Sequence, residues 1–168
     1  MKIIDDFLPK EEFKNLQNFL LSDTFPWFYN STVVHKEENV KKFIFQFAHV
    51  FYNHGIPNPY FDFVRPLLIA LQPKPYVLMR LKANLTTHSE KIIEHGYHVD
   101  LPDSKNIISS AVFYINNNDG YTKFEDGTKV NSVENRLVIF KSNIKHTGTT
   151  CTDTKIRVVL NINYIECP

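Results

Sequence analysis

Apolar residues follow a helical period in the first part of the chain and a period of two in the second. The first helical stripe comes after Leu8-Pro9 and two acidic residues, which is typical of a helix start. It consists of Phe13, Leu16, Phe19 and Leu20. A second helix is predicted from about Asn58 to Leu71. Both stripes have the width of a face that packs against a core.

From Pro75 onward, apolar and polar residues alternate as in β-strands. The odd positions of residues 76–85 are all apolar, whereas the even positions include Arg80, Lys82 and Asn84. Three further runs, 107–115, 136–141 and 155–165, also read as strands, with turn residues between them. Helices followed by many short strands predict an α+β protein whose sheets form a sandwich or a barrel.

The predicted strands have one apolar face and one mixed face, and the mixed face is unusual. It is poor in aspartate and glutamate, although a solvated sheet face normally carries both signs of charge. Its polar members are Arg80, Lys82, Asn84, Tyr114, Arg157 and Asn161. We therefore expect helices to cover the apolar face and the mixed face to line a cavity that binds an anion. The alternative is an exposed face with scattered polar residues.

Composition narrows the class of protein. The chain has 168 residues, which suits one domain, and 43% apolar with 14% aromatic residues exclude a disordered chain. A net charge of +1 gives no sign of non-specific nucleic-acid binding. Cys151 and Cys167 are too few for a disulfide scaffold, so we interpret them as free thiols, with a single bridge between them as the alternative. Without a signal peptide or an apolar stretch of membrane-spanning length, the expected location is the cytoplasm.

Four residues suggest a metal site beside an anion site. His98 and Asp100 are two apart, so on an extended segment their side chains point to the same side. A second histidine, His146, would complete the two-histidine, one-carboxylate set that non-haem Fe(II) oxygenases use. Arg157 lies on the mixed face, where a buried guanidinium needs an anion and is well shaped for a carboxylate.

In these motifs, the stretch from about Pro75 to Ile165 resembles the Fe(II)/2-oxoglutarate-dependent dioxygenases. It is most similar to the small prolyl-hydroxylase-like branch, which includes phage and bacterial members. The family pattern is His-x-Asp, a long gap, a second His, and an Arg about ten residues later, here His98, Asp100, His146 and Arg157. The resemblance implies that the first three bind Fe(II) and that Arg157, with Tyr114, binds the distal carboxylate of 2-oxoglutarate.

The resemblance also implies a fold and a reaction. The fold is a double-stranded β-helix (jelly roll, cupin-like) with N-terminal helices packed on the major sheet. We expect one domain over 1–168, with a helical support region of about 1–74 and a catalytic region of about 75–166. The implied reaction uses O₂ to hydroxylate an unactivated C–H and releases succinate and CO₂. The expected substrate is peptidyl (prolyl-like) or a free amino acid, and Asn84 is a candidate contact to 2-oxoglutarate or to this substrate.

The sequence departs from the family in places. The first glycine of the common Gly-Gly-x-Thr-x-Phe segment is Asp119, and Val159 stands where the family often has Ser or Thr. Asn163 replaces the second arginine of the nucleic-acid-repair branch, which argues against nucleobase repair. Three alternatives stay open: a catalytically silent jelly-roll metal- or ligand-binding module, an oxygenase acting on nucleic acid, and a cupin-type metal protein that is not an oxygenase.

Overall fold

The computed structural model describes residues 1–33, 45–72, 74–103, 105 and 107–166. The two predicted helices are present as α1 (Lys10–Leu20) and α2 (Phe61–Ala70). The strands are β1 (Lys2–Ile4), β2 (Phe28–Asn30), β3 (Gln46–Asn53), β4 (Ile56–Pro57), β5 (Pro75–Thr87), β6 (Ile108–Tyr114), β7 (Tyr121–Phe124), β8 (Lys129–Asn131), β9 (Leu137–Lys141), β10 (His146–Gly148) and β11 (Ile156–Glu166). The four strands predicted from alternation correspond to β5, β6, β9 and β11.

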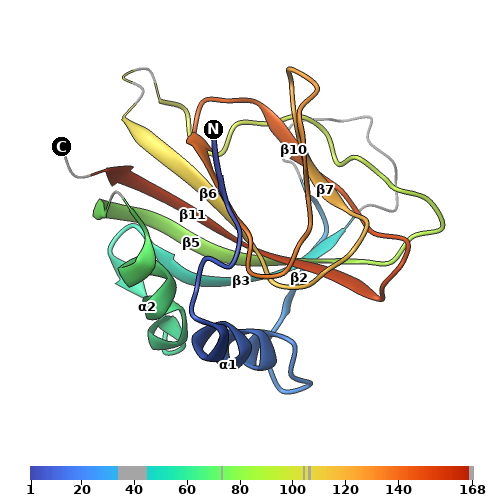
Figure 1. The fold of residues 1–168 in the computed structure, drawn as a ribbon, viewed down its shortest axis with the longest axis horizontal. Coiled ribbons are helices and arrows are strands. Elements are labelled where there is room, and N and C mark those ends of the chain that lie inside the picture. Colours follow the sequence, from blue (N-terminus) through green and yellow to red (C-terminus); the bar gives the residue numbers. More distant parts are fainter. Residues whose placement is uncertain (34–44, 73, 104, 106, 167–168) are drawn as a thin grey trace.

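The strands form two antiparallel sheets (Figure 1). The major sheet has the order β1-β9-β6-β11-β5-β3-β2, with β4 paired to β3, and the minor sheet has the order β10-β7-β8. The segment before Asp100 runs antiparallel beside β10 through the bridges Glu94–Thr149 and His98–His146, so it widens the minor sheet. Two facing sheets with these crossovers make the double-stranded β-helix that the resemblance implies.

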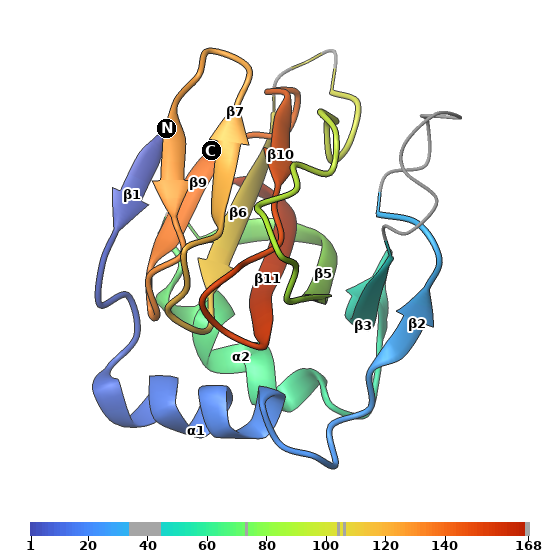
Figure 2. The ribbon, with the colours of Figure 1, turned by 90° about the vertical axis from the view of Figure 1, so that its right-hand side faces the viewer.

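Both helices lie on one face of the major sheet (Figures 1 and 2). Their buried side chains belong to one cluster with the apolar faces of β5, β6 and β11. The cluster includes Phe13, Leu16, Leu20, Val64, Leu67, Leu71, Leu81, Ala83, Phe113, Val158, Leu160 and Ile162. Helix α1 is also tied to the sheet because the Gln17 side chain donates to the carbonyl of Ile115 at 2.6 Å. The prediction that helices cover the apolar face is confirmed.

The opposite face of the major sheet points inward, toward the minor sheet. At one end, residues of both sheets form a second buried cluster. Its members are Val112, Tyr114, Phe124, Val130, Val138, Phe140 and Val159. Beside this cluster, polar side chains of β5 and β11 face a cavity between the sheets. The prediction of a cavity in place of a solvated face is therefore also confirmed.

The N-terminal 74 residues are not helical throughout, since they also contribute β1, β2, β3 and β4. Strand β3 pairs with β5 and extends the major sheet on the side of the cavity. Strand β1 pairs with β9 at the other edge. The support region therefore builds part of the sheet as well as covering it.

Two minor expectations are answered by the same structure. Cys151 is a buried free thiol, whereas Cys167 lies outside the described residues. Within the described part of the chain, neither helix has the length and apolar character needed to cross a membrane.

Candidate active site

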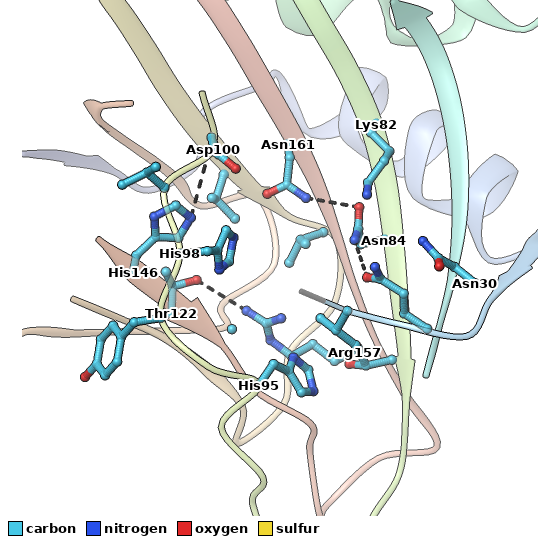
Figure 3. A pocket seen from close by; sticks show the side chains of 18 of the residues that line it. Asn30, Lys82, Asn84, His95, His98, Asp100, Thr122, His146, Arg157 and Asn161 are labelled. Atoms are coloured by element: carbon cyan, nitrogen blue, oxygen red, sulfur yellow. Dashed lines mark hydrogen bonds and ion pairs between the residues drawn. The ribbon is translucent and has the colours of Figure 1, made fainter. Parts of the chain in front are cut away.

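A cavity of about 450 Å³ lies between the two sheets (Figure 3). The major sheet supplies side chains from β5, β6 and β11, and the minor sheet supplies Thr122, His146 and Gly148. The segment between Thr87 and β6 closes another side with residues 95 and 97–100 and Pro102. Residues 30, 33 and 46, in and beside β2 and β3, line the remaining side. All three predicted metal ligands, together with Arg157 and Asn84, line this one cavity.

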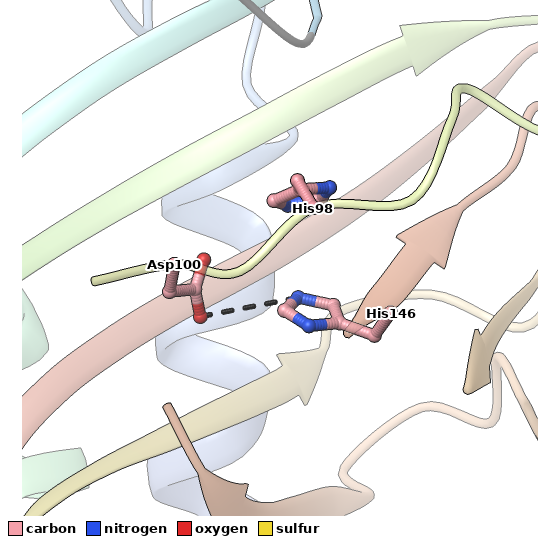
Figure 4. Close-up of side chains that lie close together, drawn as sticks. All are labelled: His98, Asp100 and His146. Carbon is pink, nitrogen blue, oxygen red and sulfur yellow. Dashed lines mark ion pairs between the residues drawn. The ribbon is translucent and has the colours of Figure 1, made fainter. Parts of the chain in front are cut away.

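His98, Asp100 and His146 converge on one point of the cavity wall (Figure 4). Each offers one ligand atom, and these atoms all lie within 4.8 Å of one another. Two backbone hydrogen bonds of 3.0 Å join residues 98 and 146, so the imidazoles, 48 residues apart in sequence, become neighbours. Their ring centroids are 4.6 Å apart, and Nε2 of His146 lies 3.9 Å from Oδ2 of Asp100.

Backbone carbonyls orient both imidazole rings. The Nδ1 atom of His146 is 3.0 Å from the carbonyl of Ile144, and the Nδ1 atom of His98 is 3.4 Å from the carbonyl of Gly96. A ring whose Nδ1–H donates to a carbonyl leaves the Nε2 lone pair free for a metal. Phe140 packs edge-on against His146 at 4.7 Å and restricts the ring further.

Asp100 is held by two side chains of the major sheet. Asn163 donates to Oδ2 at 3.1 Å, and Arg80 donates to Oδ1 at 3.5 Å. Arg80 also donates to the Asn163 amide oxygen at 3.0 Å, so the three side chains form a closed network. The carboxylate is almost fully buried, and such a network is what makes its burial tolerable.

The electrostatics of Asp100 and His98 favour their ligating forms. Burial alone would raise the pKa of Asp100, but His146, a hydrogen bond from Ser110 and the charge of Arg80 hold it below its usual range. Burial, together with the adjacent imidazole of His146, lowers the pKa of His98. A carboxylate and a neutral imidazole are the states that coordinate a cation.

This donor set fits ferrous iron. Two imidazole nitrogens and one carboxylate oxygen on one side of a cavity are the ligands of the facial triad of non-haem Fe(II) oxygenases. The rest of the cavity lies in front of them, which leaves space for further ligands on the open side. His98, Asp100 and His146 are the residues that would hold the ion.

Arg157 lies deep in the cavity and is almost fully buried. Its Nε donates to Ser132 Oγ at 2.8 Å and one terminal nitrogen donates to Thr122 Oγ1 at 3.4 Å. Burial lowers the pKa of this guanidinium. No carboxylate of the described residues lies within ion-pair distance of it, so a buried charge is left to be balanced. A carboxylate ligand is the anion that suits its planar fork.

Tyr114 and Asn84 occupy different settings. The Tyr114 side chain is fully buried between the sheets behind the cavity wall, and its hydroxyl donates to Thr122 Oγ1 at 2.8 Å. Its ring packs under the Arg157 guanidinium, 5.7 Å away. Asn84 lines the cavity directly and donates to the side chain of Gln46. The cofactor-binding roles of both residues stay predictions.

The residues that support the site are not evident from sequence patterns alone. In the sequence Asn163 is only a departure from the nucleic-acid-repair branch, whereas in the structure it donates a hydrogen bond to Asp100. It continues the cavity-facing alternation of β11 after Arg157 and Asn161, and this was the signal that could have found it. Thr122, which links Arg157 to Tyr114, stands at the threonine of the degenerate Gly-Gly-x-Thr segment.

The sequence matches no protein-family model and no curated protein. The fold, however, is that of known structures. One is a prolyl hydroxylase from Trichoplax adhaerens, solved with a hypoxia inducible factor oxygen degradation domain peptide fragment. It has a TM-score of 0.67 and 13% identity, and the match covers 98% of this chain and 83% of that one. A Pseudomonas putida prolyl-4-hydroxylase gives a TM-score of 0.63 with 15% identity over 99% and 92% of the two chains.

A third similar structure has a different activity. It is the non-heme alpha ketoglutarate dependent epimerase SnoN from nogalamycin biosynthesis, with a TM-score of 0.65, 12% identity, and coverage of 98% of this chain and 76% of that chain. At these identities the likeness establishes the architecture. The chain has the double-stranded β-helix fold of the 2-oxoglutarate- and Fe(II)-dependent oxygenases, as the resemblance of its sequence implies.

Proposed function

We propose that this protein is an Fe(II)- and 2-oxoglutarate-dependent dioxygenase that hydroxylates an unactivated C–H of a peptidyl (prolyl-like) or free amino-acid substrate. The observation that carries the proposal is the pairing of two features in one cavity. Three ligand atoms of His98, Asp100 and His146 lie within 4.8 Å of one another, and the buried cation Arg157 lines the same cavity. A fold shared with oxygenases supports the proposal, but the two features are this chain's own.

Each residue has a stated task. His98, Asp100 and His146 would hold the metal, with the two imidazole rings oriented by backbone carbonyls. Arg157 would bind the distal carboxylate of 2-oxoglutarate, and Thr122 and Ser132 hold the guanidinium in place. When bound, Fe(II) supplies the redox chemistry by which O₂ oxidises both 2-oxoglutarate, to succinate and CO₂, and the substrate C–H, to an alcohol.

The cavity walls complete the site. Val99, Val112, Val159 and Pro102 line it with aliphatic surface, which restricts water around the reacting groups. The general prolyl-hydroxylase likeness supports a peptide substrate, and one similar structure contains a peptide. A free amino acid is kept as the other substrate class because charged and amide side chains, such as Lys82 and Asn84, also line the cavity.

The test is an anaerobic titration of the metal-free protein with Fe(II) and 2-oxoglutarate, in which the chelate gives a weak visible charge-transfer band. His98→Ala should abolish the band. Arg157→Ala should leave Fe(II) binding in place but weaken 2-oxoglutarate binding by about 100-fold or more, since a buried charged contact is lost. Succinate release under air reports turnover.

Two matched variants control for the loss of a histidine or an arginine as such. His88→Ala removes an exposed histidine outside the cavity, and Arg136→Ala removes an arginine that is paired with Asp5. Both should retain the band and the 2-oxoglutarate affinity. A wild-type protein that gives neither band nor succinate would refute the proposal and favour a silent binding module.

A further inference from the structure

Part of the cavity is not used by the metal ligands or by Arg157. This part is lined by β5, by the neighbouring positions of β11, and by Gln46 of β3. Lys82, Asn84 and Asn161 lie together there (Figure 3). Lys82 and Asn161 are opposite each other in the β5–β11 register, so the group is built into two adjacent strands.

The charges that line the cavity do not balance. Besides the histidines, the ionised side chains among its described lining residues are Asp100, Arg80, Lys82 and Arg157. Arg80 is the ion-pair partner of Asp100, and Arg157 is assigned to the distal carboxylate of 2-oxoglutarate. Lys82 is the cation that remains.

Within the part of the chain that the structure describes, Lys82 forms neither a hydrogen bond nor a direct ion pair, and the nearby carboxylate of Asp100 is already paired with Arg80. Burial, reinforced by the charge of Arg80, lowers the pKa of its ammonium group, and the charge of Asp100 opposes this only in part. An ammonium that is largely withdrawn from water is costly unless an anion accompanies it. The buried ammonium of Lys82 therefore destabilises the ligand-free protein, and an anionic ligand would remove this cost.

The two asparagines next to Lys82 offer matching donors. Asn161 donates to the Asn84 oxygen at 3.3 Å, and Asn84 in turn donates to the Gln46 side chain. Gln46 donates to the carbonyl of Thr32 at 3.2 Å. This contact sets which amide donates and which accepts in each of the three hydrogen bonds. Each asparagine amide has two N–H groups and uses one of them in this row of hydrogen bonds. The second N–H of each asparagine is left for a ligand. A neutral prolyl ring would leave these donors and the ammonium unsatisfied.

Resting on the proposed function, we infer that the substrate carries a carboxylate, which binds Lys82 together with the side-chain amides of Asn84 and Asn161. The carboxylate belongs either to a free amino acid or to an acidic peptide. It is a second carboxylate site, separate from the one that Arg157 supplies for 2-oxoglutarate.

Acetate, the smallest carboxylate of this kind, is the probe. The ¹⁵N-labelled protein is saturated with Zn(II), a redox-inert substitute for Fe(II), and with 2-oxoglutarate, so that Arg157 is covered. Acetate is then titrated at constant ionic strength while the side-chain amide signals of Asn84 and Asn161 are followed by NMR. Both signals should shift and saturate below roughly 100 mM, as expected for a weak single-carboxylate contact. Acetamide, which has the same shape without the charge, should cause no such shift.

Variants separate the proposed contact from a general effect of charge. Lys82→Met should weaken the acetate response by about 10-fold or more, and Lys82→Arg should restore it. Lys141→Met removes a lysine that lies outside the cavity beside Glu166, and it should respond as wild type does. Preserved dispersion of the backbone spectrum shows that each variant is folded. The inference is overturned if acetate causes no saturable shift, if acetamide matches it, or if Lys82→Met responds normally.

The same samples keep this inference distinct from the proposed function. Failure of Zn(II) or 2-oxoglutarate to bind would refute the proposed function. The acetate-induced shifts of the Asn84 and Asn161 amide signals can be measured in that case too, so the two tests can fail separately. If Lys82→Met weakens 2-oxoglutarate binding as much as it weakens acetate binding, Lys82 contacts the cofactor and the inference is wrong.

Succinate release then distinguishes the two sources of the carboxylate. Stimulation by free L-proline supports a free amino acid, and stimulation by N-acetyl-L-aspartyl-L-prolinamide supports an acidic peptide. Stimulation by the neutral N-acetyl-L-prolinamide alone would overturn the inference, because that compound has no anion to bind Lys82.

Discussion

Gly120 leaves the room that the Arg157 side chain needs. A Cβ atom at this position would lie 2.6 Å from Cδ of Arg157 and 2.7 Å from the carbonyl of Thr150. Both distances are shorter than any normal carbon contact, so one of the neighbours would have to move. Gly120 stands at the second glycine of the Gly-Gly-x-Thr segment, and in this chain a glycine is needed there for a steric reason.

We therefore expect Gly120→Ala to displace Arg157. The affinity for 2-oxoglutarate should fall by about 10-fold or more, while metal binding is retained, and stability should fall by about 1–3 kcal/mol from overpacking. Gly127→Ala is the control, because this glycine has a φ of +89° and no neighbour within 4 Å of the added carbon. It should cost about 1 kcal/mol of backbone strain without changing 2-oxoglutarate affinity. Chelate titration and urea unfolding measure both quantities, and equal 2-oxoglutarate affinities in the two variants would contradict the steric explanation.

Asn163 gives a second prediction at the residue scale. It positions a proposed metal ligand through its 3.1 Å hydrogen bond to Asp100, so Asn163→Ala should weaken Zn(II) binding by about 10–100-fold. Asn161→Ala is the matched control, since Asn161 is on the same strand and the same face of the sheet but donates to Asn84. Calorimetric titration with Zn(II) compares them. Unchanged metal affinity in Asn163→Ala would show that the Arg80 contact alone is enough to hold the carboxylate.

At the scale of the element, α2 shows how a helix divides its residues between core and solvent. Leu67 is fully buried against the major sheet, whereas Ile69, two residues later, is 66% exposed. The helix was predictable because its buried positions, including Val64 and Leu71, recur at helical spacing. Strand β3 was not predicted, because its stability comes from pairing with β5 and its sequence lacks a strict alternation.

Leu67→Ala should lower the free energy of unfolding by about 2–5 kcal/mol, since it leaves a cavity in the main core. Ile69→Ala, in the same helix, should change it by no more than about 0.5 kcal/mol. Urea unfolding followed by far-UV circular dichroism measures both. Similar values for the two variants would mean that α2 does not pack on the sheet as described.

At the scale of the whole molecule, the proposed metal site joins two segments that lie side by side only in the folded chain. His98 and Asp100 lie on the segment before β6, and His146 lies on β10. A ligand that binds only the folded state stabilises it in proportion to the logarithm of its concentration over the dissociation constant. Occupation of the site should therefore stabilise the complete domain and not one segment alone.

With Zn(II) at 100 times its dissociation constant, stability should rise by about 2.7 kcal/mol. For a chain of this size, this corresponds to a rise of the melting temperature of about 5–10 °C. Calorimetry with Zn(II) and with a chelator measures the rise, which His146→Ala should abolish. A rise that persists in His146→Ala would place the stabilising metal elsewhere in the molecule.

The sequence alone determined the two helices, the strands β5, β6, β9 and β11, and the two faces of the sheet, because these depend on periodicities that are local in the chain. The spacing of His98 and Asp100 and the motif that adds His146 and Arg157 indicated the ligands in the same way. Only the tertiary structure decided which side chains support them. Asn163 meets Asp100, Gly120 makes room for Arg157, and Lys82 is left without a direct ion pair among the described residues. The first two relations join residues 63 and 37 positions apart, and the third depends on strands paired across the sheet. No local period records a contact between segments that only folding brings together.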